Sequence, residues 1–290
     1  MEIDLEPGRY VVAVSGGIDS MALAHALVRD GRFGLTVAHF DHGIRDDSAD
    51  DAAFVTRWAA DQGLPVYTER VELGASASEA TARQARYDFL RRIKDKVSAR
   101  AIITAHHQDD LLETVILNLQ RGTYRKGLTP FNDASDIARP LLNYKKADIR
   151  TYAFENQLEW CEDSTNQDRA YRRNKVRHDV MPRLTAAQRQ ELLSLVERTR
   201  QLNHDIDRHV SELVTGPLDR VWFRGLPTEV AREVMAQWLR DGQVGDFSRQ
   251  TVDRLSQQAR QLQTGKRIDA LGNWQIIVGK HKLALSLAER

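Results

Sequence analysis

The sequence predicts an α/β protein with a parallel twisted sheet that carries helices on both faces, followed by a long helix and a small α+β C-terminal domain. Short β-branched runs alternate with helical stretches over the first 120 residues, as they do in repeated strand–helix–strand units. Apolar residues then recur at helical spacing between Leu192 and Leu213. Near the C-terminus, two short apolar runs flank Gly279, which predicts a hairpin.

The elements of the first half follow from the period of the apolar residues. Short β-branched runs predict strands over 10–14, 35–40, 66–67 and 101–105. Apolar residues on successive turns predict helices over 21–28, 50–62, 78–97, 109–119 and 145–156. Residues 122–140 carry Gly, Pro and Asn and are expected to form an irregular loop. Ligands of such sheets bind at the carboxyl ends of the strands, so we expect the functional site there.

The pattern changes after Pro182. A long amphipathic helix is expected to end at Gly216 and Pro217, and helices over 229–241 and 248–262 follow it. Strands over 274–278 and 282–287 complete the chain. We therefore expect three segments, a first domain at 1–190, a connecting helix at 191–215 and a small domain at 216–290.

Composition excludes several classes of protein. The 290 residues include 41% hydrophobic side chains, which does not fit wholesale disorder. The longest apolar runs are far below the roughly 18 residues of a membrane span, and the acidic first ten residues do not fit a secretory signal. The one cysteine, Cys161, excludes an internal disulfide, a zinc site of several thiolates and a four-cysteine iron–sulfur cluster. We expect a soluble cytoplasmic protein.

The net charge of +1 conceals a basic block. Residues 169–189 hold seven Lys and Arg residues against Asp179, whereas residues 151–168 hold five acidic residues and no Lys or Arg. A basic block beside an acidic one suits a polyanionic partner held next to an acidic pocket. A solvated charged face has the same composition, so both interpretations stay open.

One motif lies where an anion site is expected, between the first strand and the first helix. It reads Ser15-Gly16-Gly17-Ile18-Asp19-Ser20. Glycines let the backbone turn tightly, and the following helix points its positive N-terminal end at the same place. The serines add hydroxyl groups, and the aspartate could hold a divalent cation against phosphate oxygens. The sequence contains neither a Walker motif nor a dinucleotide-binding motif after a strand. A plain strand-to-helix turn that needs glycine is the alternative.

The motif resembles the pyrophosphate-binding loop of the N-type ATP pyrophosphatases, which cleave ATP between the α- and β-phosphates and adenylate a substrate oxygen. Further stretches resemble, in order, the motifs of one family of these enzymes, the tRNA(Ile)-lysidine synthetases. These stretches are 39–45, 82–90, 104–114, 139–142, 160–166 and 171–177, and the ordered matches span about 11–184. The segment 122–131 departs from the family pattern, because it carries bulky residues where the family commonly has small ones.

The resemblance implies the fold of the adenine nucleotide α-hydrolases, a PP-loop catalytic domain at 1–190 and a tRNA-binding domain at 216–290. It implies ATP and Mg²⁺ as cofactors, with Asp19 as the metal ligand. The implied nucleotide-binding residues are Ser15, Gly16, Gly17, Ile18, Asp19, Ser20, His42 and Arg45. The implied catalytic residues are Asp19, Arg86, Asp110, Glu113, Arg173 and Arg177.

The implied substrates are free L-lysine and the isoleucine tRNA with a CAU anticodon. The wobble cytidine is adenylated at its C2 oxygen, and lysine then displaces AMP to give lysidine, with diphosphate as the other product. Asp110 and Glu113 are three residues apart on one helix face and could grip the lysine ammonium, although simple helix capping would also place them there. The family uses Arg86 near the activated base, and an ordinary salt bridge is the alternative. The sequence does not determine the oligomeric state, and a homodimer is one state that we consider.

Two other functions compete with this interpretation. A metal-dependent phosphohydrolase could use a dimetal cluster built from Asp41, His42, His106, His107 and Asp110. These side chains could equally line the nucleotide pocket, which the glycine loop favours. Another tRNA-modifying ATP pyrophosphatase, one that inserts sulfur, would usually need several cysteines.

Overall fold

A computed structural model describes residues 1–43, 48–72, 79–131, 136–162, 172–245 and 247–288. The chain forms two compact units, which are described separately. The first contains Met1–Leu117 and Pro130–Gln190, and the second contains Asn118–Thr129 and Glu191–Arg290. The second unit therefore includes a segment that interrupts the sequence of the first.

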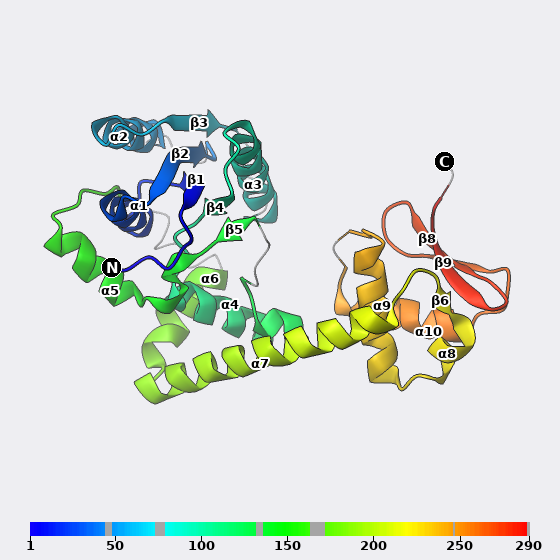
Figure 1. The fold of residues 1–290 in the computed structure, drawn as a ribbon. Helices are drawn as coiled ribbons and strands as arrows, with labels where there is room; N and C mark the ends of the chain where they lie inside the picture. Colours follow the sequence, from blue (N-terminus) through cyan, green and yellow to red (C-terminus); the bar gives the residue numbers. More distant parts are fainter. Residues whose placement is uncertain (44–47, 73–78, 132–135, 163–171, 246, 289–290) are drawn as a thin grey trace. The chain divides into compact units, whose positions relative to one another are not determined.

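The first unit is built on a parallel five-stranded sheet (Figure 1), which confirms the predicted fold class. The strands are β1 (Gly8–Ala13), β2 (Phe33–Asp41), β3 (Val66–Arg70), β4 (Ala101–Ile103) and β5 (Ile137–Ala138). Their order is β3-β2-β1-β4-β5. The strand order reverses direction between β1 and β4, and ligands of open α/β sheets bind at such a switch point. The expectation of an irregular loop over 122–140 was wrong at β5, whose two residues are too few to show a period.

Helices cover both faces of this sheet. They are α1 (Ile18–Asp30), α2 (Ser48–Asp61), α3 (Glu79–Lys96), α4 (Gln108–Gln120) and α5 (Lys146–Glu155). Consecutive residues of β1 point to opposite faces, as the pleat of a strand requires. Val12 packs in a core with Leu23 of α1 and Ile149 of α5, whereas Val11 packs in another with Phe89 of α3. Buried apolar side chains on both faces explain why the strands read as continuous apolar runs.

The second unit carries the long helix α7 (Ala186–Leu213), whose first residues belong to the first unit. Three shorter helices follow, α8 (Arg220–Gly225), α9 (Thr228–Asp241) and α10 (Arg249–Gln261). An antiparallel sheet of order β6-β9-β8-β7 consists of β6 (Leu218–Asp219), β7 (Arg267–Asp269), β8 (Trp274–Val278) and β9 (Lys282–Leu287). The predicted long helix, two helices and hairpin are confirmed, whereas α8, β6 and β7 were not predicted. Among the described residues, no helix combines the length and the apolar character that crossing a bilayer requires.

The segment 118–129 is held within the second unit by a partly buried arginine. The Arg125 guanidinium donates to Asp207 at 2.8 Å, to Glu233 at 2.6 Å and to the Asn203 side-chain oxygen at 2.7 Å. Asn203 and Asp207 lie on α7 and Glu233 lies on α9. The bulky residues that depart from the family pattern thus include one that holds this segment against two helices.

Candidate active site

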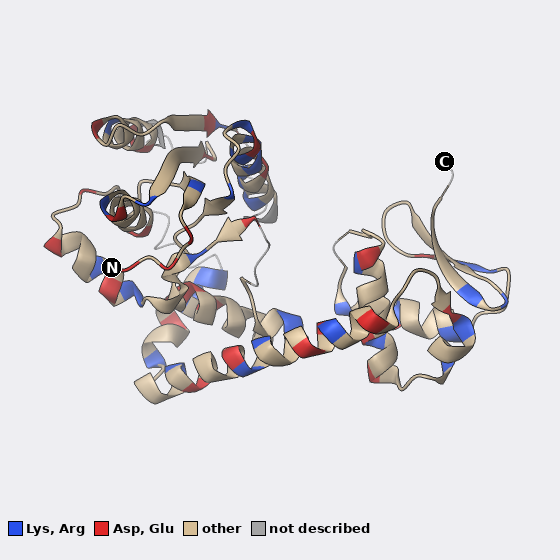
Figure 2. Cartoon of the chain, in the orientation of Figure 1, with Lys and Arg blue, Asp and Glu red and all other residues tan. Residues whose placement is uncertain are grey.

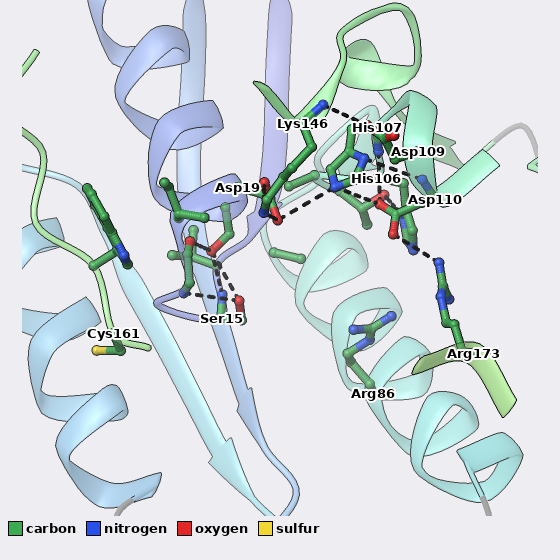
Figure 3. Close-up of a pocket in the computed structure, with 18 of the residues that line it drawn as sticks. Ser15, Asp19, Arg86, His106, His107, Asp109, Asp110, Lys146, Cys161 and Arg173 are labelled. Carbon is green, nitrogen blue, oxygen red and sulfur yellow. Dashed lines mark hydrogen bonds and ion pairs between the residues drawn. The ribbon is translucent and has the colours of Figure 1, made fainter. Parts of the chain in front are cut away.

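A pocket of about 1090 Å³ lies at the carboxyl ends of β1, β2 and β4 in the first unit. Helices α1, α3, α4 and α5 contribute side chains to its walls, as does a short helix α6 (Arg172–Lys175). Figure 3 shows the loop after β1 on one side of this pocket and the first turn of α4 on the other. The predicted site residues that line it are Ser15, Gly17, Ile18, Asp19, Ser20, His42, Arg86, Asp110, Glu113, Arg173 and Arg177.

The loop after β1 is held by its two serines. The Ser20 hydroxyl donates to the Gly17 carbonyl at 2.9 Å and accepts from the Ser15 N–H at 3.1 Å. Gly16 has a φ of +92°, in the left-handed region that favours glycine. Gly16 does not itself line the pocket, and its carbonyl accepts from the N–H of Cys161, a lining residue, at 2.9 Å. Gly17 precedes the first residue of α1, so the N–H groups of the first helical turn are directed at this end of the pocket.

The loop carboxylate already has a cationic partner inside the protein. The Lys146 ammonium lies 2.5 Å from both Asp19 carboxylate oxygens. Lys146 is the first residue of α5, and our sequence analysis did not single it out. The two residues are 127 positions apart, so no local pattern could have indicated the pair. The only sequence signal was a basic pair, Lys145 and Lys146, at the expected start of this helix.

Asp110 and Glu113 lie on one face of α4, as their spacing predicts, and two arginines bind them. Arg173 donates to Asp110 at 3.0 Å and to Glu113 at 3.1 Å. Arg177 donates to both Glu113 oxygens, at 2.7 and 3.0 Å, and to Asp110 at 3.3 Å. Four residues that were predicted to be catalytic thus form one ion-pair cluster with as many positive as negative groups.

The neighbouring aspartate, Asp109, faces another way. It accepts from the Lys146 backbone N–H at 2.8 Å and from the Arg189 guanidinium at 2.6 Å. It therefore caps the N-terminal end of α5 and ties this end to the start of α7.

His107 lies between the loop after β1, which carries Asp19, and the carboxylate of Asp110 on α4. Its Nε2 is 3.4 Å from an Asp110 oxygen and 3.8 Å from an Asp19 oxygen, and Figure 3 shows the ring between these carboxylates. The Asp110 N–H donates to the other ring nitrogen at 3.3 Å. Burial acts to raise the pKa of Asp110, but His107 and Arg173 outweigh it, and the net pKa lies below its ordinary value.

Arg86 differs from the other arginines of the pocket. It lies on α3, and its Nε is buried with no hydrogen-bond partner among the described residues. Burial lowers the pKa of Arg86, and the nearby Arg83 and Arg173 act in the same direction. A guanidinium nevertheless stays protonated at neutral pH. A buried donor group in a pocket wall, without a carboxylate of its own among the described residues, suits an anionic ligand.

The chain matches the PP-loop domain family over residues 2–184. It is also 32% identical to the tRNA(Ile)-lysidine synthase of Parasynechococcus marenigrum (strain WH8102). This alignment of 288 residues covers 92% of this chain and 85% of that relative. This chain belongs to the tRNA(Ile)-lysidine synthase family of PP-loop proteins.

Other relatives are longer than this chain. The tRNA(Ile)-lysidine synthase of Thermotoga sp. (strain RQ2) is 38% identical over 224 residues, which are 72% of this chain and 54% of that relative. The chain thus spans about half the length of this Thermotoga member of the family. The fold is similar to that of a solved structure, the U34-tRNA thiolase NcsA from Methanococcus maripaludis with its [4Fe-4S] cluster. The TM-score is 0.58 at 15% sequence identity, and the alignment covers 68% of this chain and 73% of the thiolase chain. This likeness shows a shared fold.

Two histidines of the pocket, His106 and His42, have pKa values below the ordinary value of a histidine. The pKa of His106 is lowered to about 3, chiefly by burial; Asp110 acts to raise it, and the Arg86 and Arg139 guanidinium groups act to lower it. His106 Nδ1 lies 2.9 Å from the Thr104 hydroxyl. Burial and Arg86 also lower the pKa of His42.

The two carboxylates of the alternative dimetal cluster, Asp41 and Asp110, lie against different arginines. Asp41 accepts from the Gly43 N–H at 2.8 Å and lies 3.6 Å from the Arg70 guanidinium, whereas Asp110 pairs with arginines. Within the described ranges, no group of three or more His, Cys, Asp or Glu side chains could hold a metal ion. Arg45, which was predicted to bind the nucleotide, lies outside the described residues.

Proposed function

We propose that this protein ligates free L-lysine to C2 of the wobble cytidine of isoleucine tRNA with a CAU anticodon. The reaction consumes ATP, passes through an adenylated cytidine and gives lysidine, AMP and diphosphate. The observation that carries the proposal is that the glycine loop and the Asp110–Glu113 cluster open into one pocket, with His107 between them. A two-step reaction needs a nucleotide site and an amine site next to one another.

The loop is proposed to bind the pyrophosphate portion of ATP. Its backbone N–H groups, two hydroxyls and a helix N-terminus suit phosphate oxygens. The donor set also fits Mg²⁺, because this ion commonly takes one or two carboxylates and completes its shell with phosphate oxygens and water. Asp19 would be the protein ligand, and its contact with the Lys146 ammonium shows that its carboxylate already faces a cation. When bound, Mg²⁺ would neutralise charge that develops on the phosphates.

The carboxylate cluster is proposed to hold the lysine. Glu113 and Asp110 would position the ε-amine, which must lose a proton to a carboxylate or a bound water before it can attack. Arg173 and Arg177 at present neutralise these carboxylates, so the substrate ammonium must share or replace these contacts. A cluster that contains both carboxylates and guanidinium groups is complementary to an amino acid, which carries both charges.

Arg86 is proposed to stabilise the negative charge on the α-phosphate while the cytidine oxygen attacks. Its buried Nε has no hydrogen-bond partner among the described residues, which leaves the guanidinium available for this charge. Electrostatic stabilisation by a fixed donor is strong in a water-poor pocket.

The domain assignment is part of the proposal. Those pocket-lining residues that the structure describes all belong to the first unit, which supports catalysis by residues 1–190. Residues 216–290 are proposed to bind tRNA, with 191–215 as the connecting helix. Figure 2 shows Lys and Arg on α8 and on the β8–β9 hairpin, whereas on α7 they alternate with Asp and Glu. Cationic side chains on these elements could contact phosphates. We propose a cytoplasmic location, where tRNA and ATP are present, and a homodimer, which light scattering would test.

Two other functions are supported less well. Asp41 and Asp110, the two carboxylates of the dimetal interpretation, each lie against arginines, so we favour a nucleotide pocket over a phosphohydrolase. A sulfur-inserting enzyme would have Cys161 as its sole thiol. The products of ATP cleavage distinguish adenylation, which gives AMP and diphosphate, from the phosphohydrolase. Lysine incorporation distinguishes the proposed reaction from sulfur insertion, which also begins with adenylation.

The deciding experiment is incorporation of radiolabelled lysine into a transcript of isoleucine tRNA with a CAU anticodon, with and without ATP. Elongator methionine tRNA, which has the same anticodon, is the control. We expect ATP-dependent label on the isoleucine transcript alone. Cleavage to AMP without label would retain adenylation and contradict lysine as the nucleophile, and absence of cleavage would contradict the proposal as a whole.

A further inference from the structure

Lys146 reaches across the pocket from α5 to the loop after β1. Its ammonium contacts both oxygens of Asp19 at 2.5 Å, and its side chain remains 35% exposed and lines the pocket. This ion pair links two elements that are far apart in the sequence. It also places a positive charge beside the loop that is proposed to receive phosphates.

The backbone of Lys146 is fixed independently of its side chain. Its N–H donates to Asp109 at 2.8 Å, and Asp109 is held in turn by Arg189 at 2.6 Å. The ammonium can therefore leave Asp19 without a movement of α5. Arg150 lies one helical turn further along α5 and also lines the pocket, so two cations lie on the same face of this helix.

The charge of the pocket explains why these cations are needed. A nucleoside triphosphate brings several negative charges, but the one charged side chain of residues 15–20 is the carboxylate of Asp19. Arg173 and Arg177, which also line the pocket, already pair with Glu113. If Asp19 turns to a metal ion, the Lys146 ammonium loses its present partner and becomes available to a phosphate.

We infer that Lys146 is a further nucleotide-binding residue, which exchanges the Asp19 carboxylate for the β- or γ-phosphate of the bound nucleotide. Arg150 adds a second, more exposed cation to the same wall. The inference rests on the proposed function, because it takes the loop to be the site of the pyrophosphate portion of ATP. It predicts that Lys146 discriminates between ligands with a pyrophosphate group and ligands without one.

The test is calorimetric binding of inorganic pyrophosphate and of AMP to the whole chain in the presence of Mg²⁺. Lys146→Met should weaken pyrophosphate binding by about 10- to 100-fold, the range expected for one charge-assisted hydrogen bond, and leave AMP binding within about twofold. Lys146→Arg should retain most of the affinity for pyrophosphate, and Arg150→Met should lower this affinity by less than Lys146→Met does. Lys145→Met is the matched control, because Lys145 is an exposed neighbour that is not among the pocket-lining residues.

A second comparison separates phosphate binding from simple neutralisation of Asp19. If Lys146 binds phosphate, the double variant Asp19→Asn/Lys146→Met should bind pyrophosphate more weakly than Asp19→Asn. Equal affinities of these two proteins, or unchanged or tighter binding by Lys146→Met, would overturn the inference and leave the proposed function intact. Failure of the unmodified protein to bind pyrophosphate or ATP would overturn both. Circular dichroism melting identifies any variant that does not fold, in which case Lys146→Gln replaces Lys146→Met.

Discussion

The Glu113 carboxylate is bound by the Arg177 guanidinium through two hydrogen bonds, Nε–Oε1 at 2.7 Å and Nη2–Oε2 at 3.0 Å. The Glu113 side chain is only 2% exposed, whereas that of Arg177 is 32% exposed. The carboxylate has thus lost most of its contact with water and depends on its arginines for charge compensation.

Glu113→Gln should therefore impair both folding and lysine use. We expect the free energy of unfolding to fall by about 1–3 kcal/mol, less than for a fully buried pair because the arginines keep contact with water. The KM for lysine should rise while pyrophosphate affinity stays the same. Urea unfolding and steady-state kinetics measure these effects, and Glu155→Gln, at an exposed position of α5, is the control. An unchanged lysine KM would contradict the role of Glu113 in the amine site.

Arg86→Met should separate stability from activity. The substitution removes a buried positive group that lacks a carboxylate partner among the described residues, so the melting temperature should stay the same or rise. Adenylation should slow by about 10²- to 10³-fold, as when an oxyanion-stabilising donor is lost. Melting curves and single-turnover release of diphosphate with saturating tRNA measure the two effects. Arg83→Met on the same helix is the control, and a slow, strongly destabilised Arg86→Met protein would instead indicate a structural arginine.

His106 should make stability depend on pH. Its pKa is about 3 in the folded protein, against an ordinary value of 6.5, so the unfolded chain binds a proton that the folded chain does not. The stabilisation is present above pH 6.5 and is lost as the pH falls toward 3, at up to about 1.4 kcal/mol per pH unit. His106→Gln should flatten this part of the pH profile of unfolding, which urea titrations between pH 4 and pH 7 would measure. Equal slopes in both proteins would mean that His106 titrates normally.

Gly16→Ala should damage the loop through the backbone rather than through crowding. A Cβ at Gly16 would lie 3.5 Å from Cys161 Sγ, an ordinary contact, but the φ of +92° strains any L side chain. We expect a loss of about 1–2 kcal/mol in stability and weaker binding of pyrophosphate. Cys161→Ala combined with Gly16→Ala should not restore either property. Recovery in the double variant would show that the sulfur atom, and not the backbone, is the obstacle.

Arg125→Met should destabilise the second unit and spare the nucleotide site. The Arg125 side chain is 15% exposed, and its removal leaves Asp207 and Glu233 without their shared partner. We expect faster hydrogen exchange in 118–129 and α9, and a free energy of unfolding that is lower by about 2–3 kcal/mol. The binding of pyrophosphate should be unchanged. Arg208→Met, at an exposed position of α7, is the control.

The sequence predicts elements well where they are long enough to show a period. The helices α1 to α5 and the strands β1 to β4 were expected close to their observed positions, whereas β5, with two residues, and α8, with six, lack a period that could be read. The shared face of Asp110 and Glu113 follows from their spacing. Their pairing with Arg173 and Arg177, and the contact between Lys146 and Asp19, join residues 60 to 127 positions apart, which only the tertiary fold determines. The roles of these residues stay predictions.

The segment 118–129 has a consequence for biosynthesis. The ribosome releases this segment before α7 and α9 exist, so the basic group of Arg125 emerges well ahead of Asp207 and Glu233. The sheet of the first unit is complete only after β5 has been synthesised, and β5 follows the segment 118–129 in the chain. Nascent chains halted near residue 190 should therefore expose 118–129 to proteases, and this cleavage should disappear once α9 has left the exit tunnel.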